Sequence, residues 1–143
     1  TPDELVEQLF VGIEYGCFQH AAMRRVAVPG SPLAARGQIT EHRLAQITAV
    51  VALASLHSAS TRNIAVHEPN LIGLTSGANV VYAETGINPR DTAADTSTGR
   101  GLDMAACRRM MYEAGFSALQ RGDGTLIPLA DVFAESQGIA GPG

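Results

Sequence analysis

The sequence predicts an α/β protein built on parallel strands. Three short runs, 23–28, 62–66 and 79–83, have the apolar and β-branched character of strands, and helical segments separate them. Each run ends in a polar or Pro/Gly-containing segment, which is typical of the loops at one edge of a parallel sheet. This repeating order indicates right-handed βαβ units.

The first helix is expected to begin at the N-terminus of the chain, with Thr1 as its N-cap and Glu4 closing a capping box. Gly16 is expected to end it. Its apolar residues recur at helical spacing and form one stripe: Leu5, Val6, Leu9, Phe10 and Ile13. The run 23–28 follows as the first strand, and the Pro-Gly-Ser-Pro segment 29–32 closes it as a loop.

A second helix is predicted from Thr40 to about Leu56, with Ile39 and Leu44 placed as a hydrophobic staple. It is apolar around much of its circumference, as expected for a helix that packs on a sheet between neighbours. The run 62–66 follows as the second strand.

Only one or two helical turns fit between residues 71 and 76, because Gly77 then leads into the third strand, 79–83. A last helix is predicted from the N-cap Asp103 to Ala114, followed by Gly115 at its C′ position. Its expected buried face consists of Cys107, Met110, Met111 and Ala114. The Gly-Asp-Gly segment 122–124 predicts a turn, and a weak apolar run follows it.

The composition excludes several classes of function. Hydrophobic residues make up 45% of the 143 residues and charged residues 17%, so we expect burial against a surface that this chain lacks. The net charge of −4 argues against nucleic-acid binding. No apolar stretch reaches membrane-spanning length and no signal peptide opens the chain, so we expect a cytoplasmic protein without a membrane contact. Because it begins with Thr1 rather than Met, we expect a processed product or an excised part.

The predicted sheet is incomplete. Three parallel strands form neither a closed barrel nor a sheet that is covered on both faces, and uncovered parallel strands are rare. The sequence therefore predicts a missing companion half, either an N-terminal segment or a partner chain.

His67 and Glu68 end the second strand. A histidine beside a carboxylate at a strand end can act as an acid/base pair or bind a small-molecule substrate. Alternatively, the pair precedes a helix, where Glu68 would favour the helix dipole and His67 would form a local hydrogen bond. Both interpretations stay open at this point.

Three arginines fall within the predicted strands. Arg24, Arg25 and Arg62 must each form an ion pair or meet an anionic ligand or cofactor if they lie inside a barrel. Alternation places one of Arg24 and Arg25 inward and the other toward the helices.

A polar cluster follows the third strand, and it contains Glu84, Thr85, Asn88, Arg90 and Asp91. Glu84 and Asn88 are candidate substrate contacts, because catalytic groups of α/β barrels sit where the strands end. The alternative is an Asx-type turn with a surface ion pair. Cys17 and Cys107 have no metal-ligand spacing, and we interpret them as ordinary apolar residues.

Several short motifs, taken in order, resemble biotin synthase and its radical S-adenosylmethionine (SAM) relatives. They are Pro29-Gly30-Ser31-Pro32-Leu33-Ala34, Arg62 on a strand that ends in an acidic residue, Gly77-Ala78-Asn79, Asn88-Pro89 and Glu113-Ala114-Gly115-Phe116. The resemblance covers residues 1 to about 116. It implies a TIM-type (β/α) barrel, with its last βα units in residues 1–86 and a small helical C-terminal cap and tail in 87–143.

The resemblance also implies cofactors. SAM and a [4Fe–4S] cluster would serve 5′-deoxyadenosyl-radical chemistry in cofactor biosynthesis, but the Cys-x-x-x-Cys-x-x-Cys loop that holds the cluster is absent here. By the same resemblance Val26 lies near SAM, and Arg62 lies near an auxiliary [2Fe–2S] cluster. Met23 and His67 depart from biotin synthase. The runs 23–26 and 83–91 are closer to relatives such as the methanogen enzyme implicated in making the iron-guanylylpyridinol cofactor.

Three hypotheses follow, and the second is of another class than the first, because it has no catalytic role. The chain is either the C-terminal part of such an enzyme or a non-catalytic accessory domain that completes a partner carrying the cluster. An unrelated α/β binding module is the third. The first hypothesis predicts that Arg62, His67 and Glu84 converge on one cavity at the carboxyl ends of the strands.

Overall fold

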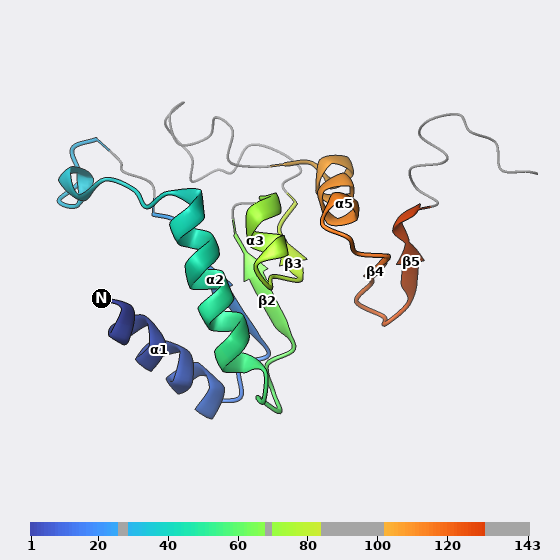
Figure 1. Ribbon diagram of the computed structural model, residues 1–143, viewed down its shortest axis with the longest axis horizontal. Coiled ribbons are helices and arrows are strands. Elements are labelled where there is room, and N and C mark those ends of the chain that lie inside the picture. Colours follow the sequence, from blue (N-terminus) through green and yellow to red (C-terminus); the bar gives the residue numbers. More distant parts are fainter. Residues whose placement is uncertain (26–28, 68–69, 84–101, 131–143) are drawn as a thin grey trace, which may run out of the picture.

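The computed structural model describes residues 1–25, 29–67, 70–83 and 102–130. These residues form a three-stranded parallel sheet, a set of helices and a two-stranded antiparallel hairpin (Figure 1). The predicted α/β class is confirmed. The described strands form an open sheet, so the TIM-type barrel stays a prediction.

The parallel sheet consists of β1 (Gln19–Ala22), β2 (Asn63–Val66) and β3 (Val80–Val81). The strands lie in the order β1-β2-β3, so each strand pairs with its neighbour in sequence. Ala21 of β1 is in register with Ala65 of β2, which is in register with Val80 of β3. The second and third strands fall within the predicted runs.

The first strand is not where the sequence placed it. It covers Gln19–Ala22, whereas residues 23–25 of the predicted run 23–28 are not in a strand and 26–28 lie outside the described residues. The run Gln-His-Ala-Ala has a weak intrinsic preference for strands, and its pairing with β2 decides its structure instead. The prediction of 23–28 is therefore wrong at its start.

The helices begin close to the predicted positions. The side chains of Thr1, Thr40 and Asp103 accept hydrogen bonds from backbone N–H groups in the first turn, which confirms these three N-caps. The helices are α1 (Pro2–Glu14), α2 (Glu41–Ser55), α3 (Leu71–Thr75) and α5 (Met104–Glu113), with a short 3-10 helix, η1 (Ala34–Arg36).

The helices also follow one another in space. Helix α1 contacts α2, α2 contacts α3, and α3 contacts α5, while α2 packs across both β1 and β2 (Figure 1). Strands and helices thus both run in chain order, which is the arrangement of a singly wound sheet. A doubly wound sheet would instead reverse its strand order at one point.

The core lies between this helix layer and the sheet. Leu44 of α2 and Val66 of β2 are fully buried, and Leu74 of α3 packs in the same cluster. Met111 of α5 and Leu129 belong to this cluster as well. Residues from both predicted parts, 1–86 and 87–143, therefore share one core, while the boundary itself lies outside the described residues.

The C-terminal part contains a hairpin that the sequence did not predict. Strands β4 (Ala118–Gln120) and β5 (Leu126–Pro128) pair antiparallel around the predicted turn at 122–124. Asp123 Oδ1 accepts hydrogen bonds from the backbone N–H and the hydroxyl of Thr125, at 2.9 and 2.7 Å. These bonds lower the pKa of the Asp123 carboxyl and stabilise the turn. In the described residues the predicted helical cap is thus one helix and a hairpin.

Candidate functional site

The sheet has a face that points away from α2 and α3. Ile64 and Val66 belong to the core under these helices, and side chains along a strand alternate between the faces. Asn63 and Ala65 therefore point to the opposite face, which we call the inner face. The register and the alternation place these residues on it: Gln19, Ala21, Asn63, Ala65 and Val80, with His67 and Tyr82 just past the ends of β2 and β3.

Three polar side chains meet on the inner face. The rings of His67 and Tyr82 are in contact, with centroids 5.3 Å apart and planes at 45°. The Gln19 side-chain amide donates a hydrogen bond to the Tyr82 hydroxyl oxygen. His67 is half-buried, and 36% of Tyr82 is exposed. We call His67, Tyr82 and Gln19 the inner-face triad.

The triad has the chemistry of a site that binds a polar small molecule. Because Gln19 donates to the Tyr82 oxygen, the phenolic hydrogen is free to be donated to a ligand. The two ring nitrogens of His67 can donate or accept a hydrogen bond. On the same face Ala21 is exposed, whereas Ala65 is fully buried. The triad can therefore orient a ligand by hydrogen bonds.

Of the candidates from the sequence, His67 lies in this site. Gln19 and Tyr82 were missed. Tyr82 stands two residues after Val80 in the predicted strand, a spacing that indicates a shared face, but no signal in the sequence singled out Gln19. Four other candidates lie outside the described residues: Val26, Glu68, Glu84 and Asn88.

Arg24 and Arg25 have structural partners. The Arg24 guanidinium lies 3.6 Å from the Glu41 carboxylate at the start of α2. Arg25 Nη2 donates to the carbonyl oxygens of Leu33 and Gly37, at 2.8 and 2.6 Å. Both arginines therefore hold the segment between β1 and α2, which favours the structural interpretation of these charges.

Arg62 lies at the other end of β2 from His67. It precedes the strand and is exposed, whereas His67 follows the strand. Five residues of extended chain separate their Cα atoms by about 16 Å. The prediction that Arg62 and His67 share one cavity at the carboxyl ends is therefore wrong, because Arg62 lies at the amino end.

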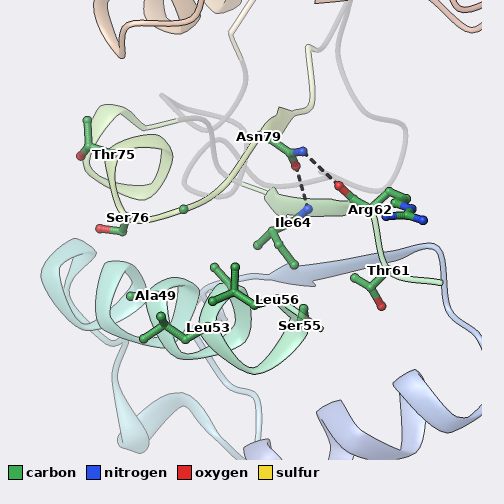
Figure 2. A pocket seen from close by; sticks show the side chains of 12 residues that line it. Ala49, Leu53, Ser55, Leu56, Thr61, Arg62, Ile64, Thr75, Ser76 and Asn79 are labelled. Carbon is green, nitrogen blue, oxygen red and sulfur yellow. Dashed lines mark hydrogen bonds between the residues drawn. The ribbon is translucent and has the colours of Figure 1, made fainter. Parts of the chain in front are cut away.

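Asn79 extends the pairing between β2 and β3 with its side chain. Its Oδ1 accepts from the Ile64 N–H at 2.8 Å, and its Nδ2 donates to the Arg62 carbonyl oxygen at 3.1 Å (Figure 2). Its backbone N–H donates to the Ile64 carbonyl oxygen at 2.8 Å. The Asn79 carboxamide thus forms hydrogen bonds with the Ile64 N–H and the Arg62 carbonyl oxygen, two backbone groups at the start of β2 that the short strand β3 does not reach.

We expect the Asn79→Ala substitution to lower the free energy of unfolding by about 2 kcal/mol, because it leaves the Ile64 N–H without its acceptor. Asn79→Asp keeps the Oδ1 acceptor but loses the Nδ2 donor, and we expect it to cost less. Urea denaturation followed by circular dichroism measures both. Equal losses for the two variants would contradict the role assigned to Oδ1.

The two cysteines do not fit an iron–sulfur cluster. Cys17 is exposed before β1, whereas Cys107 is buried in α5. Burial, with a smaller contribution from the Asp103 carboxylate, raises the pKa of the Cys107 thiol and disfavours the thiolate that a cluster needs. The part of the chain that the structure describes contains no group of three or more potential metal ligands. A cluster would have to be held by other residues than these.

We expect Cys17 to react with iodoacetamide in the native protein and Cys107 to stay unmodified until the chain unfolds. The physical reason is the difference in exposure together with the raised pKa of the Cys107 thiol. Peptide mass spectrometry after labelling with and without urea measures this. Rapid native labelling of Cys107 would show that α5 does not pack as described.

Comparisons with models of known protein families, with curated proteins and with solved structures found no significant match. Within the described ranges, no helix is both long enough and apolar enough to cross a membrane.

Proposed function

We propose that this chain is the C-terminal part of a biotin-synthase-like radical SAM enzyme in the cytoplasm. In this proposal β1, β2 and β3 are the last strands of a TIM-type barrel. The inner-face triad contributes to the pocket in which a small-molecule substrate meets the 5′-deoxyadenosyl radical. The cluster and most of the SAM site come from an N-terminal barrel half.

The singly wound arrangement is the observation that carries the proposal. Consecutive parallel strands lie side by side, and the helices α1, α2, α3 and α5 follow each other in the same order. An arc of a (β/α) barrel has this arrangement, with its helices outside and its other face inside. A barrel would also pair the outer edges of β1 and β3, which have no partner strand among the described residues, with further strands.

The position of the triad supports the same proposal. His67 and Tyr82 follow the carboxyl ends of β2 and β3 and lie on the face without α2 and α3. Enzymes with (β/α) barrels place their reacting groups at this end. The motifs that resemble the biotin synthase family cover the same region of the chain.

A second candidate function is an accessory domain that completes a partner carrying the cluster. The observation that favours it is the cysteine content: the whole sequence holds only two cysteines, and neither suits a cluster. In both cases the inner face is completed by another polypeptide segment.

The proposal is tested with the product of the whole gene, reconstituted with iron and sulfide and reduced anaerobically. We expect formation of 5′-deoxyadenosine from SAM, measured by chromatography. His67→Ala should lower this rate at least about tenfold, a loss of about 1.4 kcal/mol of transition-state stabilisation. Tyr15→Phe, at a residue that is 85% exposed beside α1, is the matched control and should leave the rate unchanged.

Two outcomes would contradict the proposal. The first is a protein that binds its cluster but forms no 5′-deoxyadenosine. The second is equal activity of the His67→Ala and Tyr15→Phe variants. This result would show that the inner-face triad does not contribute to the reaction.

A further inference from the structure

A pocket of about 650 Å³ lies at the amino ends of β2 and β3, at the opposite end of these strands from His67 and Tyr82. We call it the amino-end pocket. The C-terminal half of α2, the end of α3 and the start of β2 surround it (Figure 2). Its volume is in the range of small-molecule sites in proteins.

One side of the amino-end pocket is apolar. Leu53 of α2 and Leu56, its C-cap residue, line it, and they are 68% and 69% exposed, which is high for leucines next to a cavity. Ala49 and Ala52 extend the same surface. A hydrocarbon chain placed here would remove apolar area from water on both partners.

The pocket also contains a buried polar atom that lacks a partner. Ser55 lines the pocket and is 7% exposed, and within the described residues its Oγ is buried without a hydrogen-bond partner. A buried hydroxyl without a partner is unfavourable, and a polar atom of a bound ligand or a water molecule would satisfy it. The hydroxyl can both donate and accept.

Arg62 supplies a positive charge at the rim of the pocket. In Figure 2 its side chain extends from the start of β2 away from Leu53 and Leu56. The described residues place no carboxylate within ion-pair distance of its guanidinium, so this cation can receive an anionic group. The pocket is thus apolar at one end and cationic at the other.

We propose that the amino-end pocket binds a small amphiphilic carboxylate, with its hydrocarbon part on Leu53 and Leu56 and its carboxylate on Arg62. A guanidinium binds a carboxylate through two parallel, charge-assisted hydrogen bonds, which are stronger than its bonds to a neutral polar group. The pocket lies away from the carboxyl ends of the strands. The inference therefore goes beyond the proposed function and stands without it.

The probe is sodium octanoate, titrated into the full chain labelled with ¹⁵N and followed by two-dimensional NMR. We expect saturable shifts of the Leu56, Ile64 and Gly77 amide signals, which surround the pocket. Arg62→Gln should weaken octanoate binding about tenfold, and Leu56→Ala should also weaken it. The matched control is Arg36→Gln, which removes the same charge from an exposed position in η1 and should leave the affinity unchanged.

A second ligand distinguishes the contribution of the apolar end of the pocket to the affinity from that of the cationic end. Octanol has the same hydrocarbon chain without the carboxylate, so its affinity should be lower than that of octanoate and unaffected by Arg62→Gln. The proposal is overturned if octanoate causes no saturable shifts. Equal weakening by the Arg62 and Arg36 variants would also overturn it, because only net charge would then matter.

Discussion

Replacing Leu44 with alanine is expected to lower the free energy of unfolding by about 3 kcal/mol, within the range of about 2–5 kcal/mol measured for such changes in cores. Leu44 is fully buried on α2 and packs in the cluster that joins the helix layer to β1 and β2. The substitution removes this packing and leaves a cavity between α2 and the sheet. Chemical denaturation monitored by circular dichroism measures the loss.

Leu53→Ala is the matched control on the same helix. Leu53 is 68% exposed, so the same chemical change should alter the free energy of unfolding by less than about 0.5 kcal/mol. If the two variants lost the same stability, α2 would not present Leu44 to the sheet, and the described core would be wrong.

The second large effect is expected at Gly77, which precedes β3. Its φ of 109° is a conformation that residues with a side chain rarely adopt, and a Cβ there would lie 2.7 Å from the Ala52 Cβ. Strain and overpacking contribute about 1–3 kcal/mol each, so Gly77→Ala should cost about 3 kcal/mol or more. Thermal and urea denaturation measure the effect.

The two contributions can be separated by experiment. At Gly115, which has a φ of 90°, no atom of the described residues lies within 4 Å of an added Cβ, so Gly115→Ala should show the backbone strain alone. Adding Ala52→Gly to Gly77→Ala removes the contact and should recover part of the loss beyond the small cost of a glycine in a helix. A Gly115→Ala loss as large as that of Gly77→Ala would contradict the close approach of α2 to the turn before β3.

The helices could be predicted because their signals are local. A capping side chain such as Thr40 or Asp103 is recognised from its own sequence, and the apolar stripe of a helix repeats over many residues. The end of α5 could also be predicted, because a glycine is the residue most often found at the C′ position of a helix. In the structure Gly115 directly follows the C-cap and has a φ of 90°.

The first strand could not be predicted in the same way. Gln19–Ala22 carries neither β-branched nor aromatic residues, and it is a strand because β2 lies beside it. The run 23–28 has a stronger apolar pattern, but Arg24 and Arg25 in it hold the segment before α2. Pairing between distant segments thus overrode the local preference.

The candidate site was predicted only in part for the same reason. His67 was recognisable because it ends a clear strand. Its contact with Tyr82 and the hydrogen bond from Gln19 depend on the register of three strands, which the sequence does not reveal. Arg62 was already the first residue of the predicted run 62–66, and in the structure it directly precedes β2, so both place it at the amino end of the sheet. The shared cavity with His67 was expected from the family resemblance and not from the position of Arg62 in the strand.

The central claim is that this chain continues from the first half of a radical SAM barrel. The most direct measurement is the sequence of the coding region that precedes Thr1. We expect an open reading frame that continues upstream in frame and encodes a Cys-x-x-x-Cys-x-x-Cys motif ahead of further βα units. A start codon directly before Thr1 would contradict it.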